Sequence, residues 1–350
     1  MNMERKNAWN GYETEELKKV DALNQEYRTF LNEGKTEREC VKLAVKMAEE
    51  AGYRDLKEVI AKKETLKAGD KVYAVGMKKM ISLFQIGKKP LEEGMAILGA
   101  HIDSPRLDIK QNPLYEEGGF AYLDTHYYGG IKKYQWVTLP LAIHGVIAKK
   151  DGTVVDVKIG EDKEDPVFCV TDLLIHLSAD RMEKKANKVI EGEELDLLFG
   201  SKPLKGKERD FLSAELEIVP AGEAREAGID TSMIMGYGQD DRVCAFTSLK
   251  AMLEVEGTEY TTCCLLVDKE EIGSVGATGM QSKTFENTVA EILACMGEYS
   301  DLAVRRCLAN SKMLSSDVSA AFDPTFKSAY EPKNAAYFGK GMVFNKFTGS

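Results

Sequence analysis

Two short apolar runs constrain the fold of this chain more than any other feature of its sequence. Residues 95–102 and 261–267 each have the length of one strand, and neither alternates strictly between polar and apolar positions. Strands of this kind are apolar on both faces because the sheet that contains them is covered on both sides. The chain therefore predicts an α/β fold with a mixed, largely buried sheet.

Helices are predicted on either side of these runs in the sequence. Residues 13–52 have the spacing of two helices, and the second opens with Thr36 followed three residues later by Glu39, which is the pattern of a capping box. A further helix is predicted from about 241 to 253, just before the second apolar run. Another is predicted near 286–307, after it.

The middle of the chain has the pattern of strands and turns instead. Residues 136–148 and 153–159 flank Lys150-Asp151-Gly152, a sequence typical of a β-hairpin. Residues 211–219 alternate as another strand would, and the polar stretch 183–209 before them is predicted to be a solvated excursion. We therefore predict an α/β domain made of residues 1–106 and 231–350, interrupted by an inserted β-rich domain of residues 107–230.

Charge and composition narrow the classes of function. The formal net charge of −10 disfavours nucleic acid or an anionic membrane as a partner, because both require clustered cationic groups. No run approaches the roughly 20 apolar residues that cross a bilayer, and the polar N-terminus lacks the apolar core of a signal peptide. The seven cysteines form no CxxC pair and stand mostly in apolar runs, as reduced cysteines do. We expect a cytoplasmic protein.

Chemistry is first indicated by a histidine at the end of the first apolar run. In Ala100-His101-Ile102-Asp103, the histidine and the aspartate are two residues apart in an extended segment, so they face the same side. A metal-binding imidazole commonly has a carboxylate on its other nitrogen, which fixes the tautomer and raises its basicity. His101 is therefore a candidate metal ligand and Asp103 its orienting partner. A histidine that is simply hydrogen-bonded at a strand end is the alternative.

Three acidic clusters accompany this pair, each at a predicted strand end or in the turn after it. Asp240 and Asp241 follow two glycines, and the alternative for them is a helix cap. Glu270 and Glu271 are adjacent on a turn, where one can bind a metal while the other acts as general base; an exposed acidic turn is the alternative. Asp317 lies between serines, where an Asx turn or a cap is the alternative.

Together the four clusters describe a dinuclear metal site better than any one of them does alone. One histidine and three carboxylates, with a spare glutamate beside one of them, suit a Zn/Zn or Mn/Zn pair. In such a site a shared carboxylate bridges ions that are roughly 3.5–4 Å apart, and a polarised water lies between them. The residues themselves thus indicate a two-metal hydrolase.

The order and spacing of these motifs resemble a known family. The runs AHIDSPR, GQDDR, DKEEIGS and SSDVSAAFDP resemble those of the aspartyl aminopeptidases, which are dinuclear zinc aminopeptidases. The resemblance extends over essentially the whole chain. It implies a zinc-aminopeptidase-like catalytic domain and a metal-dependent enzyme that removes N-terminal residues, acidic ones by the family's name, from peptides.

The resemblance also implies a role for each candidate residue. The implied ligands of the two divalent ions, Zn or alternatively Mn or Co, are His101 and Asp317 on one ion, Asp240 between both, and Glu271 on the other. Glu270 is implied to be the general base that takes a proton from the metal-bridging water, with Asp103 orienting His101.

Assembly is implied as well. Residues 107–230 would be a dimerisation domain, and the dimers would form a larger, dodecameric homo-oligomer. In that particle His176 would reach toward the active site of a neighbouring subunit.

The chain departs from the family in one respect. In the family a histidine near the C-terminus completes the second metal, whereas the four histidines here are His101, His126, His144 and His176. His126 and His144 are predicted to be structural. We therefore expect this chain to be the leading three-quarters or so of the enzyme. A catalytically inactive, truncated chain that serves as an assembly subunit is the alternative function.

Overall fold

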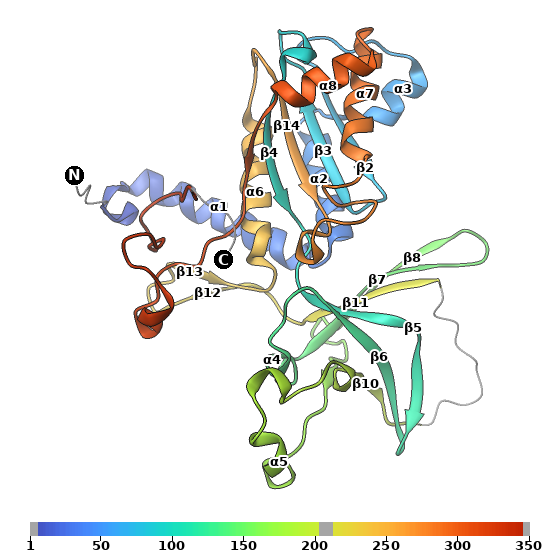
Figure 1. The fold of residues 1–350 in the computed structure, drawn as a ribbon, viewed down its shortest axis with the longest axis vertical. Coiled ribbons are helices and arrows are strands. Elements are labelled where there is room, and N and C mark those ends of the chain that lie inside the picture. The colour runs from blue at the N-terminus through green and yellow to red at the C-terminus, as the bar shows by residue number, and fades with distance from the viewer. Residues whose placement is uncertain (1–5, 203–212, 346–350) are drawn as a thin grey trace.

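Two sheets, one above the other in Figure 1, dominate the computed structural model, which describes residues 6–202 and 213–345. The upper one, sheet A, is mixed and has the strand order β1-β2-β3-β14-β4-β15. Its strand β4 runs parallel to both of its neighbours, whereas β3 runs antiparallel to both of its own. The strands are β1 (Arg54–Asp55), β2 (Lys71–Gly76), β3 (Met80–Gln85), β4 (Met95–His101), β14 (Thr261–Val267) and β15 (Lys312–Ser315).

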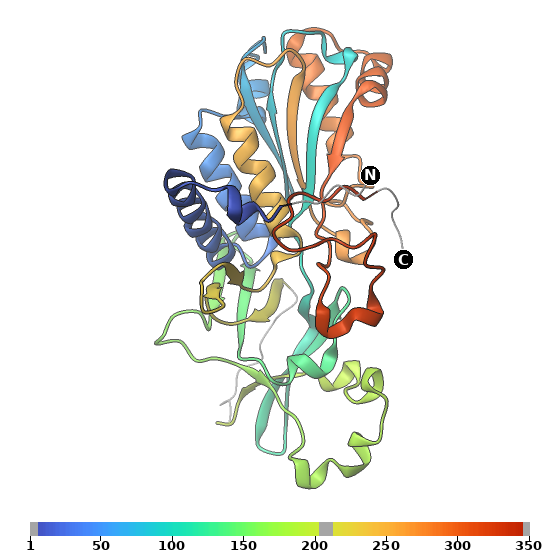
Figure 2. The ribbon, with the colours of Figure 1, turned by 90° about the vertical axis from the view of Figure 1, so that its left-hand side faces the viewer.

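Helices cover both faces of sheet A, which explains its apolar strands and confirms the predicted mixed and largely buried sheet. Phe30, Ala44 and Phe246 from the helices of one face pack against Leu83 and Leu266. Figure 2 shows the strands between the two helical layers. The layer with Phe30 consists of α1 (Thr14–Glu33), α2 (Glu37–Glu50) and α6 (Gln239–Glu254), and the opposite layer of α3 (Leu56–Lys62), α7 (Thr284–Met296) and α8 (Asp301–Asn310).

The helix predictions are correct at the N-terminus and wrong near residue 300. Thr36 caps α2 as predicted, since its side chain accepts from the Glu39 amide while Glu39 accepts from the Thr36 amide. The single helix expected over 286–307 is two helices, because Gly297 takes a left-handed φ of 76° and ends α7. Ser300 then caps α8. Within the described residues, no helix is both long and apolar enough to span a membrane.

The lower one, sheet B, is antiparallel and has the order β8-β7-β11-β5-β6-β10-β9. The predicted hairpin is confirmed, since β7 and β8 pair across the turn that contains Gly152. The strands are β5 (Arg106–Glu117), β6 (Phe120–Tyr128), β7 (Leu141–Ala148), β8 (Val154–Ile159), β9 (Cys169–Val170), β10 (Leu197–Gly200) and β11 (Ala214–Pro220).

The solvated excursion expected over 183–209 is correct for residues 183–188, which are exposed, and wrong for the segment that leads into β10. Leu195 and Leu197 are fully buried, and β10 pairs with β6 inside sheet B. A few apolar residues in a polar stretch are enough for this, because their side chains reach the core while the charged neighbours face solvent. Residues 203–212, which include the beginning of the strand predicted at 211–219, lie outside the described residues.

Short elements connect these parts. The hairpin of β12 (Arg225–Ala227) and β13 (Met233–Met235) leads from sheet B back to α6. The remaining short helices are α4 (Lys133–Trp136), α5 (Ala179–Met182), η1 (Ala8–Gly11), η2 (Leu91–Glu93), η3 (Ile175–Leu177), η4 (Ala186–Lys188), η5 (Gly192–Glu194), η6 (Glu270–Ile272) and η7 (Pro324–Ala329).

Buried ions hold sheet B against the helices and turns of sheet A. Arg106 at the start of β5 lies 3.1 Å from Glu37 of α2 and 3.4 Å from Glu217 of β11, in each case between side-chain atoms. Lys79 lies 3.2 Å from Glu217 and 3.6 Å from Glu37. Burial alone raises the pKa of Glu37, but the charges of Arg106 and Lys79 outweigh it and hold that pKa below its ordinary value. We call these four residues the junction network.

A second buried cluster lies at the same boundary. Both nitrogens of the His144 imidazole donate to carboxylates, Nδ1 to Glu39 at 2.8 Å and Nε2 to Glu161 at 3.0 Å. Glu161 also accepts from the Lys35 ammonium at 2.7 Å. We call these four residues the histidine network. His144 is fully buried within it, as a structural histidine would be.

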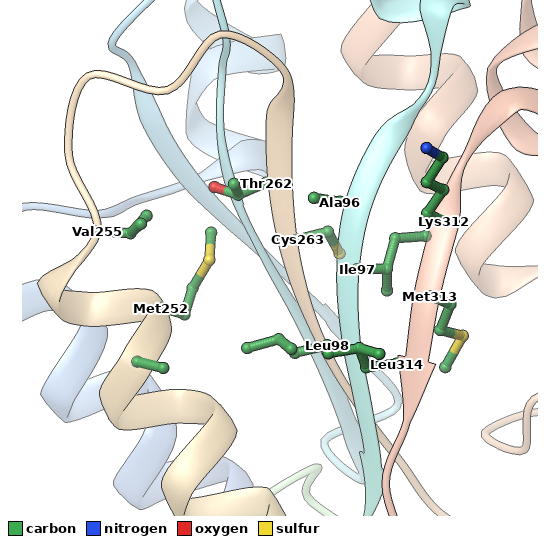
Figure 3. A pocket seen from close by; sticks show the side chains of 11 residues that line it. Ala96, Ile97, Leu98, Met252, Val255, Thr262, Cys263, Lys312, Met313 and Leu314 are labelled. Atoms are coloured by element: carbon green, nitrogen blue, oxygen red, sulfur yellow. The ribbon is translucent and has the colours of Figure 1, made fainter. Parts of the chain in front are cut away.

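Sheet A is least covered at its β15 edge. Met313 and Leu314 of β15 are 40% and 56% exposed. A pocket of about 310 Å³ lies on the sheet there, between β4, β15 and the end of α6. Figure 3 shows the apolar side chains that line it, among them Leu98, Met252 and Leu314. In the described part of the chain, the helical layers thus stop short of this edge.

Candidate metal centre

Three neighbouring parallel strands end at one place, and each end carries a predicted site residue. His101 is the last residue of β4 and stands opposite Val267 of β14. Ser315 of β15 stands opposite Gly99, so Asp317 lies two residues further on, level with His101. The carboxyl ends of parallel strands are where open α/β sheets commonly place their sites. The register therefore brings together residues that are more than 200 positions apart in the sequence.

His101 is the centre of the cluster. Its side chain is 3% exposed, and its Nε2 faces the carboxylates of Asp240 at 3.2 Å, Glu270 at 3.7 Å and Asp317 at 3.9 Å. Burial alone lowers the pKa of His101, but the hydrogen bonds to Asp103 and Asp240 outweigh it and raise the pKa to about 11. Positive charge is therefore strongly favoured at this point.

The other nitrogen of His101 is oriented by Asp103, but mainly through the backbone. Nδ1 lies 3.0 Å from the Asp103 carbonyl oxygen and 3.4 Å from the Asp103 carboxylate, whereas the sequence led us to expect the carboxylate. Because a carbonyl can only accept, Nδ1 carries the proton of the neutral ring. The lone pair on Nε2 then points into the carboxylate cluster, as a metal ligand requires.

The turn before α6 places Asp240 next to His101. Gly238 has a φ of +77°, and a Cβ there would lie 1.9 Å from Nη1 of Arg242, so this position requires glycine. Asp240 and Asp241 are joined by a cis peptide bond, and neither residue has helical φ and ψ. The Ser104 hydroxyl donates to the Asp240 carbonyl at 2.7 Å. No side chain caps α6, so a helix cap does not explain these two aspartates.

Asp241 is a member of the cluster that the sequence analysis did not assign. Its carboxylate is fully buried, and neither oxygen has a hydrogen-bond partner among the described residues. Burial, together with the charges of Asp317 and Asp240, raises the pKa of Asp241 to about 7. The sequence signal was only its position beside Asp240. A buried carboxylate without a partner is costly unless a cation or a proton is supplied to it.

The turn after β14 presents the two glutamates. Asp103 accepts hydrogen bonds from the amides of Glu270 at 3.2 Å and Glu271 at 3.1 Å, which fixes this turn against the end of β4. Burial and the charge of Asp240 raise the pKa of Glu271 to about 7, and burial likewise raises the pKa of Glu270. Both glutamates therefore lie where the charge of His101 only partly offsets burial and the neighbouring carboxylates.

The cluster suits a divalent cation. Two sets of possible ligand atoms share His101. One set is His101 with Asp240 and Glu271, and the other is His101 with Asp241 and Asp317; within each set the ligand atoms all lie within 4.8 Å of one another. In the described part of the chain, no lysine or arginine forms an ion pair with any of these four carboxylates. Imidazole and carboxylate ligands together favour zinc or manganese. The donor set and the unpartnered oxygens of Asp241 thus fit the metal that the sequence predicts.

The other histidines lie elsewhere. His126 is exposed on β6, where its ring stacks on Tyr127 with the centroids 5.5 Å apart. His176 is exposed in η3 and is not part of the cluster around His101. Sequence analysis also missed Tyr128, whose hydroxyl donates to the Asp103 carboxylate at 2.6 Å. No sequence motif indicates that a tyrosine at the end of a strand contacts a metal centre.

Comparison with known proteins identifies relatives along the whole chain. Residues 30–209 and 200–350 match the family model described as aminopeptidase I zinc metalloprotease (M18). The probable M18 family aminopeptidase 1 of Clostridium acetobutylicum is 59% identical over 368 residues, which span 99% of this chain and 79% of that protein. The counterpart from Thermotoga maritima is 40% identical over 375 residues, spanning 100% of this chain and 80% of that protein.

Solved structures agree with these sequence matches. The crystal structure of aminopeptidase I from Clostridium acetobutylicum matches with a TM-score of 0.89 at 56% identity, covering 100% of this chain and 80% of the other. The M18 aminopeptidase of Thermotoga maritima also gives 0.89, at 39% identity, over 97% and 78% of the two chains. The mApe1 dodecamer of S. cerevisiae has the same fold at 20% identity, with a TM-score of 0.70 over 89% and 75%.

Proposed function

Because the chain belongs to the M18 family of zinc metalloproteases, we propose that the cluster around His101 is its metal-dependent peptidase site. The family membership makes the protein an aminopeptidase that depends on a divalent metal. What we propose beyond this is the residue assignment. The observation that carries it is the convergence of three carboxylates on Nε2 of one buried histidine.

The proposed metal ligands are those that the resemblance to the aspartyl aminopeptidases implies, and each of them belongs to at least one of the two overlapping sets. His101 and Asp317 would hold one ion and Glu271 a second, with Asp240 between them. Asp241 lies close enough to His101 and Asp317 to balance the charge of the first ion. The proposed ions are zinc, with manganese and cobalt as substitutes, because carboxylate-rich sites accept several divalent metals.

Glu270 is the proposed general base. Bound zinc would supply Lewis acidity, which polarises the scissile carbonyl and makes a water molecule more acidic. The Glu270 carboxylate is half exposed, and its Oε2 lies 3.7 Å from Nε2 of His101, so it is open to substrate on one side. It would accept a proton on one carboxylate oxygen and return it to the leaving amine. The raised pKa of Glu270 suits a group that holds a proton in transit.

The proposed substrate is the N-terminus of a peptide. Its free α-amine would lie near the ion that Glu271 is proposed to hold. The finer proposal, which rests on the resemblance to the aspartyl aminopeptidases, is that acidic N-terminal residues are preferred. Chromogenic amides of Asp, Glu, Ala and Leu, compared by kcat/KM, test this preference.

We also propose a homo-oligomer. Leu174, Ile175 and Leu177 flank His176 and are 71%, 67% and 70% exposed, which is unusual for neighbouring apolar side chains on a free surface. Another copy of the chain would cover them, and the yeast relative forms a dodecamer. We keep residues 107–230 as the proposed assembly domain and His176 as the residue that would reach a neighbouring active site. Sedimentation velocity of the chain and of Ile175→Asp tests the interface.

Glu270→Gln tests the assignment of the base. General base catalysis is worth about 10²–10⁴-fold, so we expect kcat to fall about 1,000-fold. The zinc dissociation constant should change by less than about threefold, because the ligands remain. Glu298→Gln is a matched control on an exposed glutamate outside the cluster. Full activity of Glu270→Gln would mean that another group accepts the proton.

A further inference from the structure

The Asp103 carboxylate is fully buried next to the metal centre, and one of the groups that donates a hydrogen bond to it lies outside sheet A. It accepts hydrogen bonds from the backbone amides of Glu270 and Glu271, and its Oδ1 lies 3.4 Å from Nδ1 of His101. Its remaining partner is the hydroxyl of Tyr128, which donates to Oδ2 at 2.6 Å. Tyr128 is the last residue of β6 and therefore belongs to sheet B.

The ring of Tyr128 is held in one place. It is 5% exposed, and the Arg106 guanidinium lies over it at 3.9 Å from the ring centroid. The two residues are also direct partners in the pairing of β5 with β6. On the turn with the glutamates, the Lys269 ammonium lies 5.2 Å from the same centroid. Because the ring is fixed by these contacts, the hydroxyl loses little freedom when it donates to Asp103.

The end of β6 also contacts the glutamate turn directly. Gly129 has a φ of +74°, and a Cβ at this position would lie 3.2 Å from Cβ of Glu271. Figure 1 shows β6 and β5 directly below the lower ends of β4 and β14. The junction network, through Arg106, thus connects to the metal centre by a short path of buried contacts: Arg106, Tyr128, Asp103, and then His101 and the two glutamate amides.

We propose that Tyr128 is a positioning residue for the metal centre, whose hydroxyl holds the Asp103 carboxylate in the orientation that fixes the turn of Glu270 and Glu271 beside His101. The inference rests on the proposed function for its link to metal. Without the hydroxyl, Asp103 would lose one of the donors that determine its rotamer, and the glutamate turn would be held less firmly. Sheet B would then contribute directly to the geometry of a site built on sheet A.

The test removes one oxygen atom. Tyr128→Phe keeps the ring and its contact with Arg106 but removes the donor to Asp103. Tyr127→Phe is the matched control, since adjacent strand residues face opposite sides and Tyr127 is 39% exposed. Three quantities are measured on the full chain: hydrogen exchange of the Glu270 and Glu271 amides without metal, the zinc dissociation constant by chelator competition, and kcat with KM at saturating zinc.

For Tyr128→Phe, we expect the two amides to exchange about tenfold faster, because a hydrogen bond to a charged group holds them indirectly. We expect zinc to bind about tenfold more weakly, at the lower end of the effect of residues behind metal ligands. The value of kcat should fall while KM changes little. Unchanged exchange and zinc affinity, even with a lower melting temperature, would overturn the proposal, because Tyr128 would then only support packing.

The readouts separate this inference from the proposed function. Amide exchange requires no metal, so it tests the action of Tyr128 on the glutamate turn whether or not the chain binds zinc. Failure of the unaltered chain to bind zinc would instead contradict the proposed ligand assignment. Normal zinc binding by the unaltered chain and by both variants, with normal exchange, would contradict only the role of Tyr128.

Discussion

Glu37 of the junction network and the carboxylates of Asp241 and Glu271 in the metal centre are the same kind of group, but their pKa values shift in opposite directions. Both regions place buried carboxylates where sheet A meets sheet B. In the junction network, the charges of Arg106 and Lys79 hold the pKa of Glu37 below its ordinary value. Burial and the neighbouring charge of Glu37 raise the pKa of Glu217 to about 8. Among the described residues, no lysine or arginine forms an ion pair with the carboxylates of the metal centre. There the pKa values of Asp241 and Glu271 rise to about 7.

A lysine or arginine partner within the chain separates carboxylates that support the fold from carboxylates that can bind a cation from outside. A carboxylate that has its cation within the chain is complete when the chain folds. One that has only other carboxylates and a single imidazole around it needs a cation from outside, or protons in its place. Whether a buried carboxylate is structural or metal-binding therefore depends on the groups that surround it and not on the acidic residue itself. The predictions below test this distinction on matched residues.

The largest expected effect separates the two buried histidines. His101→Ala should weaken zinc binding by at least about 1,000-fold, because it removes the imidazole ligand of the ion that His101 and Asp317 are proposed to hold. His144→Gln should leave zinc affinity within about threefold, since the His144 ring bonds to Glu39 and Glu161, which are not members of the cluster around His101. Isothermal titration with zinc measures both. Equal losses in the two variants would remove the distinction between the metal centre and the structural histidine.

Removal of a paired charge should destabilise the protein. Glu37→Gln leaves Arg106 and Lys79 buried with one partner fewer, so we expect the free energy of unfolding to fall by about 3 kcal/mol. Urea unfolding of the metal-free chain measures the change, and Glu298→Gln is the exposed control. No loss of stability would mean that Glu37 is not compensated in the way its lowered pKa indicates.

The histidine network should make stability depend on pH. The pKa of His144 is raised from its ordinary value of 6.5 because its bonds to Glu161 and Glu39 outweigh burial, so its contribution is full below pH 6.5. That contribution is lost as the pH rises through the folded value. The pKa of Glu161 is lowered from 4.5 to about 2 by His144 and Lys35 despite burial, so its contribution is full above pH 4.5 and is lost toward pH 2.

We therefore expect the network to stabilise the chain most between pH 4.5 and 6.5. Above pH 6.5 the free energy of unfolding should fall by about 1.4 kcal/mol for each pH unit until the pH reaches the folded pKa of His144. Urea midpoints of the metal-free chain at several pH values, with and without His144→Gln, measure the effect. A variant with the same decline above pH 6.5 as the parent would assign that decline to other groups.

The smallest expected effect has the opposite sign to that of Glu37→Gln. Asp241→Asn removes an uncompensated buried charge, so the metal-free chain should become more stable by about 1 kcal/mol. Zinc binding should weaken at the same time, because the charge next to His101 and Asp317 is lost. The melting temperature with and without zinc reports both changes. Destabilisation of the metal-free chain would show that Asp241 has a cation within the fold.

Much of sheet A could be predicted from local pattern. The runs at 95–102 and 261–267 are β4 and β14 almost residue for residue, and the capping box at Thr36 begins α2 as expected. The strand β10 could not be predicted, since Leu197 and its few apolar neighbours stand among charged residues and only tertiary contacts bury them. The break at Gly297 was missed although the sequence carries signals for it, a glycine that ends α7 and Ser300 that caps α8.

The candidate site divides in the same way. His101, Asp240, Glu270, Glu271 and Asp317 carry chemistry that a sequence displays, and the structure places all five within one cluster. Their assigned roles stay predictions. Asp241 and Tyr128 could not be assigned from sequence, because the importance of each depends on what surrounds it in space. For Asp241 this is the absence of a partner among the described residues, and for Tyr128 it is the carboxylate of Asp103.

The pairing of β4 with β14 and β15 has a consequence for folding. Each strand delivers its ligand by position, so a slip of one residue would move that ligand by about 3.3 Å and turn it to the opposite face. Only the native register of all three strands places His101, Glu271 and Asp317 together. Zinc capture during refolding would therefore report the moment at which the alignment of these strands becomes correct, and bound metal would penalise every misaligned pairing.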